Sequence, residues 1–345
     1  MTPGAGDGPI DTWGVDVHGH AVPERFLQEM ARTRFAGVGV DASEGRYVLT
    51  LPDGKTLRPC AGTMLDFAGR PAWLDGQGLR TQLVAPWLDV QGQELAAVEG
   101  SVWVRELNNA MAEAVRASAR RLWPHATLHM ADAATAAREL ERAVRDLGMT
   151  GCMLPTNFPG GHLAESRYDA LWEAAASLGV PIVLHPPTVA PSGCLFAGDM
   201  PDFRALYGRL IDTTLTAARL VVAGVLDRFP GLQLLLVHGG GFLPYQTGRL
   251  EYEYGAKLEG RSPTDEVRRF LYDTTLLSHA AVRMLVELVG EGRLMLGSDY
   301  GSAPAQRVVG RVAEGVTRAA LDDAARRAIL RENAERIFRL DPGAA

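Results

Sequence analysis

The chain of 345 residues is 47% hydrophobic and 22% charged, a composition typical of a folded enzyme and not of a disordered protein. Its net charge of -6, without a cluster of Lys and Arg, argues against nucleic acid as a partner, and no run of about 18 apolar residues predicts a membrane span. The cysteines, Cys60, Cys152 and Cys194, are widely spaced and form no CxxC pair, so a disulfide framework is not expected and a reducing cytoplasm fits.

The first strand expected along the chain, residues 15–20, carries two histidines two positions apart. Side chains at i and i+2 of a strand lie on one face, so His18 and His20 are expected to point the same way. Gly19 between them leaves room for another part of the chain to approach closely. Two imidazoles on one face form half of a metal site, and the rest of the chain has to supply the other ligands.

An irregular stretch follows the helix that we expect at residues 23–34. Within it, residues 47–51 and 56–58 flank a turn-forming Pro-Asp-Gly-Lys segment at 52–55, which predicts a β-hairpin. We interpret this stretch, about residues 37–78, as an insertion that forms a flap over the site.

Further along the chain, short β-rich runs alternate with longer amphipathic stretches. The expected strands are residues 82–85, 127–130, 152–155, 182–185, 234–238, 270–273 and 294–297. The expected helices are residues 101–118, 135–147, 168–178, 214–223, 244–258, 280–289 and 324–338. With the first strand and helix, this alternation predicts parallel strands, right-handed crossovers and a (β/α)8 TIM barrel. We expect one domain over residues 13–340, with flexible ends at 1–12 and 341–345.

Polar residues close three of the apolar runs. His185 ends the fifth strand, His238 ends the sixth, and Asp299 follows the eighth. In a parallel barrel all strand C-termini lie on one face, so these side chains are expected to converge with His18 and His20. A doubly wound open sheet, the main rival fold, gives no reason for ligand-type residues to end so many separate strands. Imidazole and carboxylate together suit Zn, Mn or Fe(II).

The number of metal ions follows from the fourth strand. One buried histidine is more simply explained as a core residue bonded to a backbone carbonyl, but four at strand ends favour a metal centre. A second metal ion in such barrels is usually bridged by a carboxylated lysine on the fourth strand, and residues 151–155 read Gly-Cys-Met-Leu-Pro. We therefore expect one divalent metal ion per chain, with open positions for water and substrate.

These residues, in this order and setting, resemble the amidohydrolase superfamily, and within it the branch of amino-carboxymuconate-semialdehyde decarboxylase and related metal-dependent aromatic acid decarboxylases. The resemblance extends over nearly the whole chain. Besides the ligands, it rests on residues 105–110 (RELNNA), 151–157 (GCMLPTN), 224–230 (GVLDRFP), 238–241 (HGGG), 272–274 (YDT) and 296–300 (LGSDY).

The resemblance implies a role for each polar residue of the constellation. His18, His20, His185 and Asp299 become the metal ligands, with Zn favoured and Mn as the alternative. His238 becomes the acid/base residue beside the metal, and Asp299 joins it in catalysis.

Two arginines are also implied to bind the carboxylate of a substrate, a group that suits a guanidinium fork. Arg58 would act within its own chain, and Arg249, on the helix after the sixth strand, would be lent by the partner subunit of a homodimer. Without the resemblance, either would be read as a surface arginine. The branch has aromatic residues after its strand-five His-Pro and strand-eight Ser-Asp-Tyr, where this chain has residues 187–188 (PT) and 301–302 (GS), so substrate identity is not carried over.

The function that the resemblance implies is non-oxidative decarboxylation of a small aromatic or unsaturated, muconate-type carboxylic acid, without nucleic-acid or membrane partners. A metal-dependent hydrolase or hydratase on the same barrel is the alternative, with Asp299 as general base. The missing lysine and the presence of Arg58 favour decarboxylation. A barrel that had lost its chemistry and only bound ligands would have damaged metal ligands, and none is damaged here.

Overall fold

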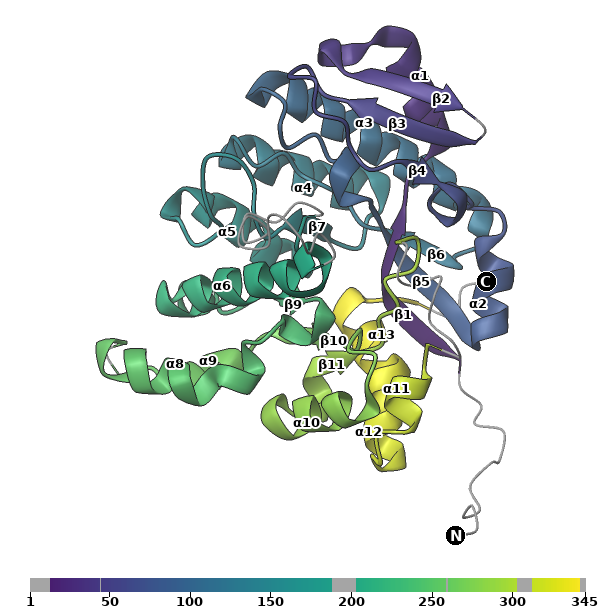
Figure 1. Ribbon diagram of the computed structural model, residues 1–345. Coiled ribbons are helices and arrows are strands. Elements are labelled where there is room, and N and C mark those ends of the chain that lie inside the picture. The colour runs from purple at the N-terminus through teal and green to yellow at the C-terminus, as the bar shows by residue number, and fades with distance from the viewer. Residues whose placement is uncertain (1–12, 44, 188–202, 259, 303–311, 342–345) are drawn as a thin grey trace.

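Parallel strands occupy the centre of the molecule in the computed structural model, which describes residues 13–43, 45–187, 203–258, 260–302 and 312–341 (Figure 1). One sheet has the order β1 (Gly14–Ala21), β5 (Leu79–Pro86), β6 (Leu122–Pro124). The other runs from β7 (Cys152–Pro155) through β8 (Ile182–His185), β9 (Leu234–Leu236) and β10 (Leu271–Asp273) to β11 (Leu294–Met295). Neighbouring strands within both sheets are parallel and follow one another in chain order, as the alternating pattern predicts.

The two sheets meet at two seams, each held by single bridges rather than by a continuous ladder. Ala126, just after β6, forms a parallel bridge with Cys152 of β7. At the other seam Gly19 of β1 bridges Tyr300, and the His20 amide donates to the Tyr300 carbonyl at 2.7 Å. The strands therefore follow the order of an α/β barrel, but the sheet is not continuously closed.

The side chains of the strands divide into two apolar clusters. The larger cluster joins the strands to the surrounding helices, and it includes Leu154, Ile182, Leu184 and Leu236. The smaller cluster is formed by Val15, Val17, Leu83, Ala85, Met153, Val183, Leu235, Val237, Leu271 and Met295, together with residues of the last helix. Because it joins residues of seven strands in one contact network, this cluster fills the space inside the ring. Strands covered on both faces are continuous apolar runs for this reason.

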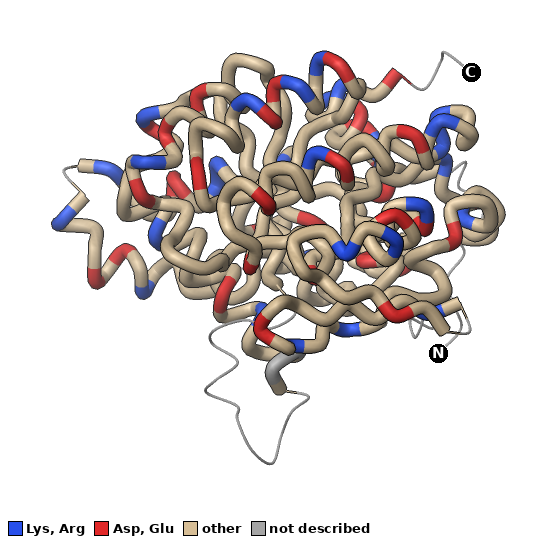
Figure 2. The backbone as a smooth tube through the Cα atoms, turned by 90° about the horizontal axis from the view of Figure 1, so that it is seen from above, with Lys and Arg blue, Asp and Glu red and all other residues tan. Residues whose placement is uncertain are grey.

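Helices surround the strands (Figure 1). They are α1 (Glu24–Thr33), α2 (Arg70–Gln77), α3 (Ala97–Val115), α4 (Ala133–Leu147), α5 (Asp169–Leu178), α6 (Arg209–Val222), α7 (Val225–Arg228), α8 (Thr247–Tyr254), α9 (Pro263–Val267), α10 (His279–Val289), α11 (Glu314–Thr317), α12 (Asp323–Arg327) and α13 (Asn333–Phe338). Asp132 and Ser278 cap α4 and α10 through their side chains. Among these helices none is long and apolar enough to cross a bilayer. Basic and acidic positions alternate along the tube in Figure 2 without forming a stripe of one sign in that view.

Several expected elements have other bounds in the structure, the expected helix at 324–338 is divided into α12 and α13 by a π-helical segment, and two elements differ most in position. The third strand is β6, and the run at 127–130, expected as a strand, is not one. A strand needs a partner, and β5 pairs with residues 122–124 instead, whose short apolar run carried a weaker signal. The second difference is α6, which begins at Arg209 and not at residue 214, because the buried face of its first turn is polar (Arg209, Asp212 and Thr213) and hides the helical period. Cys194 and the expected flexible segment 1–12, with 342–345 of the expected tail, lie outside the described residues.

The expected insertion contains an antiparallel sheet of β2 (Gly39–Ser43), β3 (Arg46–Thr50) and β4 (Cys60–Ala61). The predicted turn forms, since the Leu51 amide donates to the Lys55 carbonyl at 2.9 Å. The main partner of β3 is nevertheless β2, which precedes it, and the predicted partner segment contributes one bridge, from Thr56 to Thr50. Lys55 also pairs with Glu94, 3.4 Å away, and so ties the turn to the barrel. A function of this insertion as a flap stays a prediction.

Gly19 gives a direct test of the packing between the first two parallel strands. A Cβ at this position would lie 2.5 Å from the side-chain carbonyl carbon of Gln82. We expect Gly19→Ala to lower the free energy of unfolding by about 1–3 kcal/mol, the usual cost of overpacking, measured by urea denaturation. Gly76→Ala is the control, because Gly76 lies within α2 with no atom near its added Cβ, and this change should leave stability equal or higher. Equal stability of both variants would contradict the close approach.

Candidate metal centre

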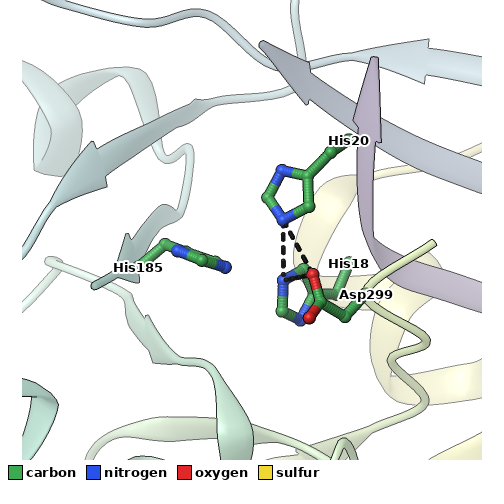
Figure 3. Close-up of side chains that lie close together, drawn as sticks. All are labelled: His18, His20, His185 and Asp299. Atoms are coloured by element: carbon green, nitrogen blue, oxygen red, sulfur yellow. Dashed lines mark hydrogen bonds and ion pairs between the residues drawn. The ribbon is translucent and has the colours of Figure 1, made fainter. Parts of the chain in front are cut away.

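Three histidines and one aspartate, contributed by three strands and the residues that follow them, meet at the C-terminal ends of the barrel strands (Figure 3). His18 and His20 lie near the end of β1, His185 is the last residue of β8, and Asp299 follows β11. One ligand atom from each lies within 4.8 Å of all the others, and all four residues are buried. The structure therefore brings together the four residues that the sequence predicts as metal ligands.

Hydrogen bonds fix the tautomers of two of these imidazoles. His18 Nδ1 lies 2.6 Å from Oδ2 of Asp273, and because a carboxylate only accepts, this nitrogen carries the proton. In the same way His185 Nδ1 donates to the Pro186 carbonyl at 2.8 Å. The Nε2 atoms of both rings are then lone-pair donors, and Nε2 of His185 is buried without a hydrogen-bond partner. Unpaired lone pairs in a buried site fit a cation between them.

The electrostatics of the site also favour a cation. Burial lowers the pKa of His20 to about 4 and that of His185 well below its ordinary value, so both rings are neutral ligands at neutral pH. Burial alone would raise the pKa of Asp299, but nearby histidines hold it well below its usual range. Burial would lower the pKa of His18, yet Asp299 and Asp273 raise it. The two buried carboxylates thus make this position favourable for positive charge, and the residues fit a divalent metal ion.

His238 lies beside this cluster and differs from its members in access to the outside. Its Nε2 is 3.7 Å from Oδ2 of Asp299, and its side chain is 12% exposed, whereas those of His18 and His20 are fully covered. His238 and Asp299 both have positive φ, 54° and 59°, in the left-handed region that most residues avoid. Such backbone strain costs about 1–3 kcal/mol per residue and is concentrated at functional sites.

Asp273 and Asp16 accept hydrogen bonds from residues of the site, and neither was predicted from the sequence to have a role there. Asp273 ends β10, and besides His18 it accepts from the Gly239 amide at 3.0 Å. Asp16 accepts from the amides of His18 and Ser298, both at 3.0 Å. Both are acidic residues within or at the end of a buried strand. This placement is the feature of the sequence that could have indicated a role in the site.

A fully buried arginine, Arg70 of α2, also supports the site. Its guanidinium donates to the carbonyl of His20 at 2.7 Å, to that of Thr63 at 2.8 Å and to Oε1 of Gln82 at 2.7 Å. It lies over the ring of Tyr300, which stacks on Trp73 of the same helix. No pattern in the sequence distinguishes this arginine from the others, because its partners come from distant segments.

A cavity of about 400 Å³ lies near the cluster, although none of the cluster's four residues lines it. It is lined by Arg58 and other residues of the insertion, by Leu88 and by Pro155, which pairs with His185 across the sheet. The Arg58 guanidinium lies 5.4 Å from the ring centre of Trp87, and Trp87 in turn contacts the ring of His20. Arg58 is therefore near the cluster, as its predicted role requires.

Arg249 lies elsewhere. It is exposed on α8, and it forms no ion pair within the described part of its own chain. The structure does not bring it to the site of its own chain.

A ring of parallel strands whose C-terminal ends hold three histidines and an aspartate defines the class of metal-dependent α/β-barrel proteins. The chain belongs to the amidohydrolase family, whose model matches residues 15–340. Membership of this family implies a TIM-barrel α/β fold, as the sequence predicts, although the two sheets are joined only by single bridges.

Several proteins to which this chain is similar are decarboxylases. The chain is 23% identical to a 2-amino-3-carboxymuconate-6-semialdehyde decarboxylase of Dictyostelium discoideum, over 95% of this chain and 92% of the relative. It is similar to the crystal structure of 5-carboxyvanillate decarboxylase from Sphingomonas paucimobilis, with a TM-score of 0.78, 25% identity and coverage of 96% and 100% of the two chains. A dihydroxybenzoic acid decarboxylase from Polaromonas, solved with bound manganese and an inhibitor, shares the fold with a TM-score of 0.76 and 22% identity, over 95% and 97% of the chains.

Asp273 should control metal affinity without being a ligand. We expect Asp273→Asn to weaken metal binding by about 10- to 100-fold, because it removes the charge that orients and polarises His18. Competition with a chelator of known affinity measures this. Asp265→Asn, an exposed residue in the first turn of α9, is the matched control and should bind metal as the unchanged protein does. Equal affinities of both variants would remove Asp273 from the metal centre.

Proposed function

We propose that this protein is a metal-dependent, non-oxidative decarboxylase of a small aromatic or muconate-type carboxylic acid. The convergence of His18, His20, His185 and Asp299 beside His238 carries the proposal. The relatives named above, which are decarboxylases of such acids, support it.

The four buried residues would hold one divalent metal ion, with Zn favoured and Mn as the alternative. Zn is common at sites of imidazole and carboxylate, and a related structure contains manganese. When bound, the ion supplies a Lewis acid that polarises an oxygen of the substrate. The fourth strand, β7, has no lysine, which supports one ion rather than two.

Decarboxylation needs a proton at the carbon that bears the carboxylate. In the proposed reaction that carbon is protonated, its bond to the carboxylate breaks, the electron pair returns to the conjugated system, and carbon dioxide leaves. His238 is the group proposed to hold and deliver the proton, because its Nε2 lies 3.7 Å from Oδ2 of Asp299 and its side chain is partly exposed. A conjugated ring or carbonyl is required to accept the electron pair, and this sets the substrate class.

The cavity near the cluster supports the proposed place of the substrate. Arg58 at its wall would bind the carboxylate, and the apolar surfaces of Leu88 and Pro155 would contact the ring or chain. We propose that residues 37–78 act as a flap over this cavity, because Lys55 to Arg58 line it and the remainder contacts the barrel through Arg70.

The function is tested by incubating the metal-loaded protein with aromatic and muconate-type acids and measuring released carbon dioxide. We expect stoichiometric release with one or more of these acids and loss of release after chelation. A product that keeps the carboxylate and has gained water would contradict decarboxylation and favour the hydrolase or hydratase alternative.

His238 and His185 should respond differently to replacement. His238→Ala should keep one metal ion per chain by elemental analysis and lower turnover by about 10²- to 10⁴-fold, the usual contribution of a general acid or base. His185→Ala should lose the metal. His279→Ala, exposed at the start of α10, is the control and should change neither. Metal loss in His238→Ala would make it a ligand, and two ions per active chain would contradict a single-metal centre.

We also propose that two chains form a homodimer in which each lends Arg249 to the site of the other. The exposure of Arg249 supports this, as does Tyr252 on the same helix, which is 86% exposed. Tyrosine and arginine are enriched in protein interfaces.

We also propose a cytoplasmic location, because the three cysteines are widely spaced and form no CxxC pair.

Mixing two inactive variants tests the shared site. His238→Ala and Arg249→Ala are each expected to be inactive. A mixed dimer would contain one site with both changes and one with neither, so subunit exchange should restore about half of the activity per mixed dimer. Exchange shown by differently tagged chains, without recovered activity, would place Arg249 outside the partner's site. A monomer in sedimentation would contradict the dimer itself.

A further inference from the structure

Arg58, which lines the cavity near the metal centre, contacts an aromatic ring rather than an acidic partner. Its side chain is half-buried, and it forms no hydrogen bond or ion pair within the part of the chain that the structure describes. The guanidinium carbon lies over the indole of Trp87, 5.4 Å from the ring centre. A separation below about 6 Å is typical of cation–π contacts, in which arginine is the commoner cation and tryptophan the best ring.

Trp87 is held in place at the C-terminal end of β5. It follows the last residue of that strand, and its amide donates to the Ala21 carbonyl of β1 at 3.3 Å. Its side chain is 1% exposed, and its indole meets the ring of His20 edge to face, with the ring centres 4.9 Å apart. One buried indole therefore contacts both a proposed metal ligand and the arginine proposed to bind the carboxylate.

Hydrogen bonding does not explain a tryptophan at this position. Nε1 of Trp87 has no hydrogen-bond partner among the described residues, whereas Nε1 of Trp103 donates to the Val90 carbonyl at 2.7 Å. A buried donor without a partner lowers stability, and a phenylalanine would fill apolar space without leaving one. The face of an indole, however, attracts a cation more strongly than that of a phenyl ring. The contact with Arg58 therefore gives a reason for tryptophan here.

We propose that Trp87 is a positioning residue, whose ring holds the Arg58 guanidinium at the wall of the cavity, in place to bind the carboxylate of a substrate. The inference rests on the proposed function and adds the residue that orders Arg58. An arginine side chain loses rotamer freedom when it binds an anion, which weakens binding, and a side chain that is already ordered loses less. A cation–π contact also leaves N–H groups of the guanidinium available to the carboxylate.

The first test measures binding of benzoate and benzamide to the manganese-loaded protein by titration calorimetry. The two probes share a ring, but only benzoate carries a charge that Arg58 can bind. We expect Trp87→Leu to weaken benzoate binding by about 3- to 30-fold, the range of a cation–π contact, and Trp87→Phe, which keeps a weaker ring, to weaken it less. Benzamide binding should stay unchanged, and both variants should keep one metal ion per chain by elemental analysis.

A double-mutant cycle with Arg58→Met separates an effect through Arg58 from a direct one. If Trp87 acts through Arg58, the double variant with Trp87→Leu should bind benzoate as weakly as Arg58→Met alone. The same four proteins, compared in urea unfolding, test the contact without any ligand. There we expect the two changes to be non-additive by about 2- to 5-fold in the unfolding equilibrium constant.

Trp172→Leu is the matched control. Trp172 of α5 is also buried with an Nε1 that lacks a partner, and no cation of the described residues lies over its ring. This change should lower stability, because it leaves a similar cavity, but it should leave benzoate binding unchanged and be additive with Arg58→Met. If Trp87→Leu does not fold, Trp87→Phe and Trp172→Phe take its place and that of the control.

Equal weakening of benzoate and benzamide binding, loss of the metal ion in Trp87→Phe, or additive effects of the Trp87 and Arg58 changes would each overturn the proposal. Failure of the proposed function appears differently. In that case the two changes stay coupled in unfolding, but benzoate binds no form of the protein, or binds Arg58→Met as tightly as the unchanged protein. That result would keep the contact and overturn its role in carboxylate binding.

Discussion

The hydrogen bond between Asp273 and His18 is the interaction on which the arrangement of the site depends. It joins residues 255 positions apart, sets the tautomer of His18 and brings a negative charge behind the ring. Asp273 is itself held by the Gly239 amide, so the same carboxylate also fixes the turn that begins at His238. One buried aspartate thus links the ends of β1, β9 and β10. A buried carboxylate without hydrogen-bond partners would lower the stability of the fold. The donors around Asp273 and its negative charge therefore stabilise each other.

The convergence of the ligands could be predicted from the sequence because it depends on two regular properties. Side chains alternate along a strand, and parallel strands of a barrel end on one face, so His18, His20, His185 and Asp299 had to approach each other. The roles of Asp273 and Arg70 could not be derived in this way. Their partners are backbone groups and distant side chains, and the fit that selects them exists only in the folded chain. The third strand was misplaced for a related reason, since pairing with β5 decides which apolar run becomes a strand.

Several residues around the site adopt backbone conformations that their residue types do not favour. His238 and Asp299 adopt left-handed conformations, and a Cβ at Gly301 would lie 2.1 Å from the His20 carbonyl oxygen. The glycine that departs from the pattern of the resembled branch is therefore required by this close contact, whatever its effect on substrate binding. Such strain persists only where surrounding contacts fix the chain, as Asp273 does for Gly239 and as Asp16 does for Ser298. Hydrogen bonds from buried carboxylates accordingly hold the backbone where the proposed metal ligands lie.

The residue proposed to bind the substrate carboxylate comes from a part of the chain other than those that supply the proposed metal ligands. The proposed ligands lie in the strands or shortly after them, whereas Arg58, which lines the cavity, belongs to the insertion. The spacing between strands is fixed by the apolar interior, so a change among the ligands would disturb the barrel. A change at Arg58 would alter the lining of the cavity and leave the interior packing intact. With this separation, the metal chemistry of a family can stay constant while the residues around the cavity, and with them the substrate, differ.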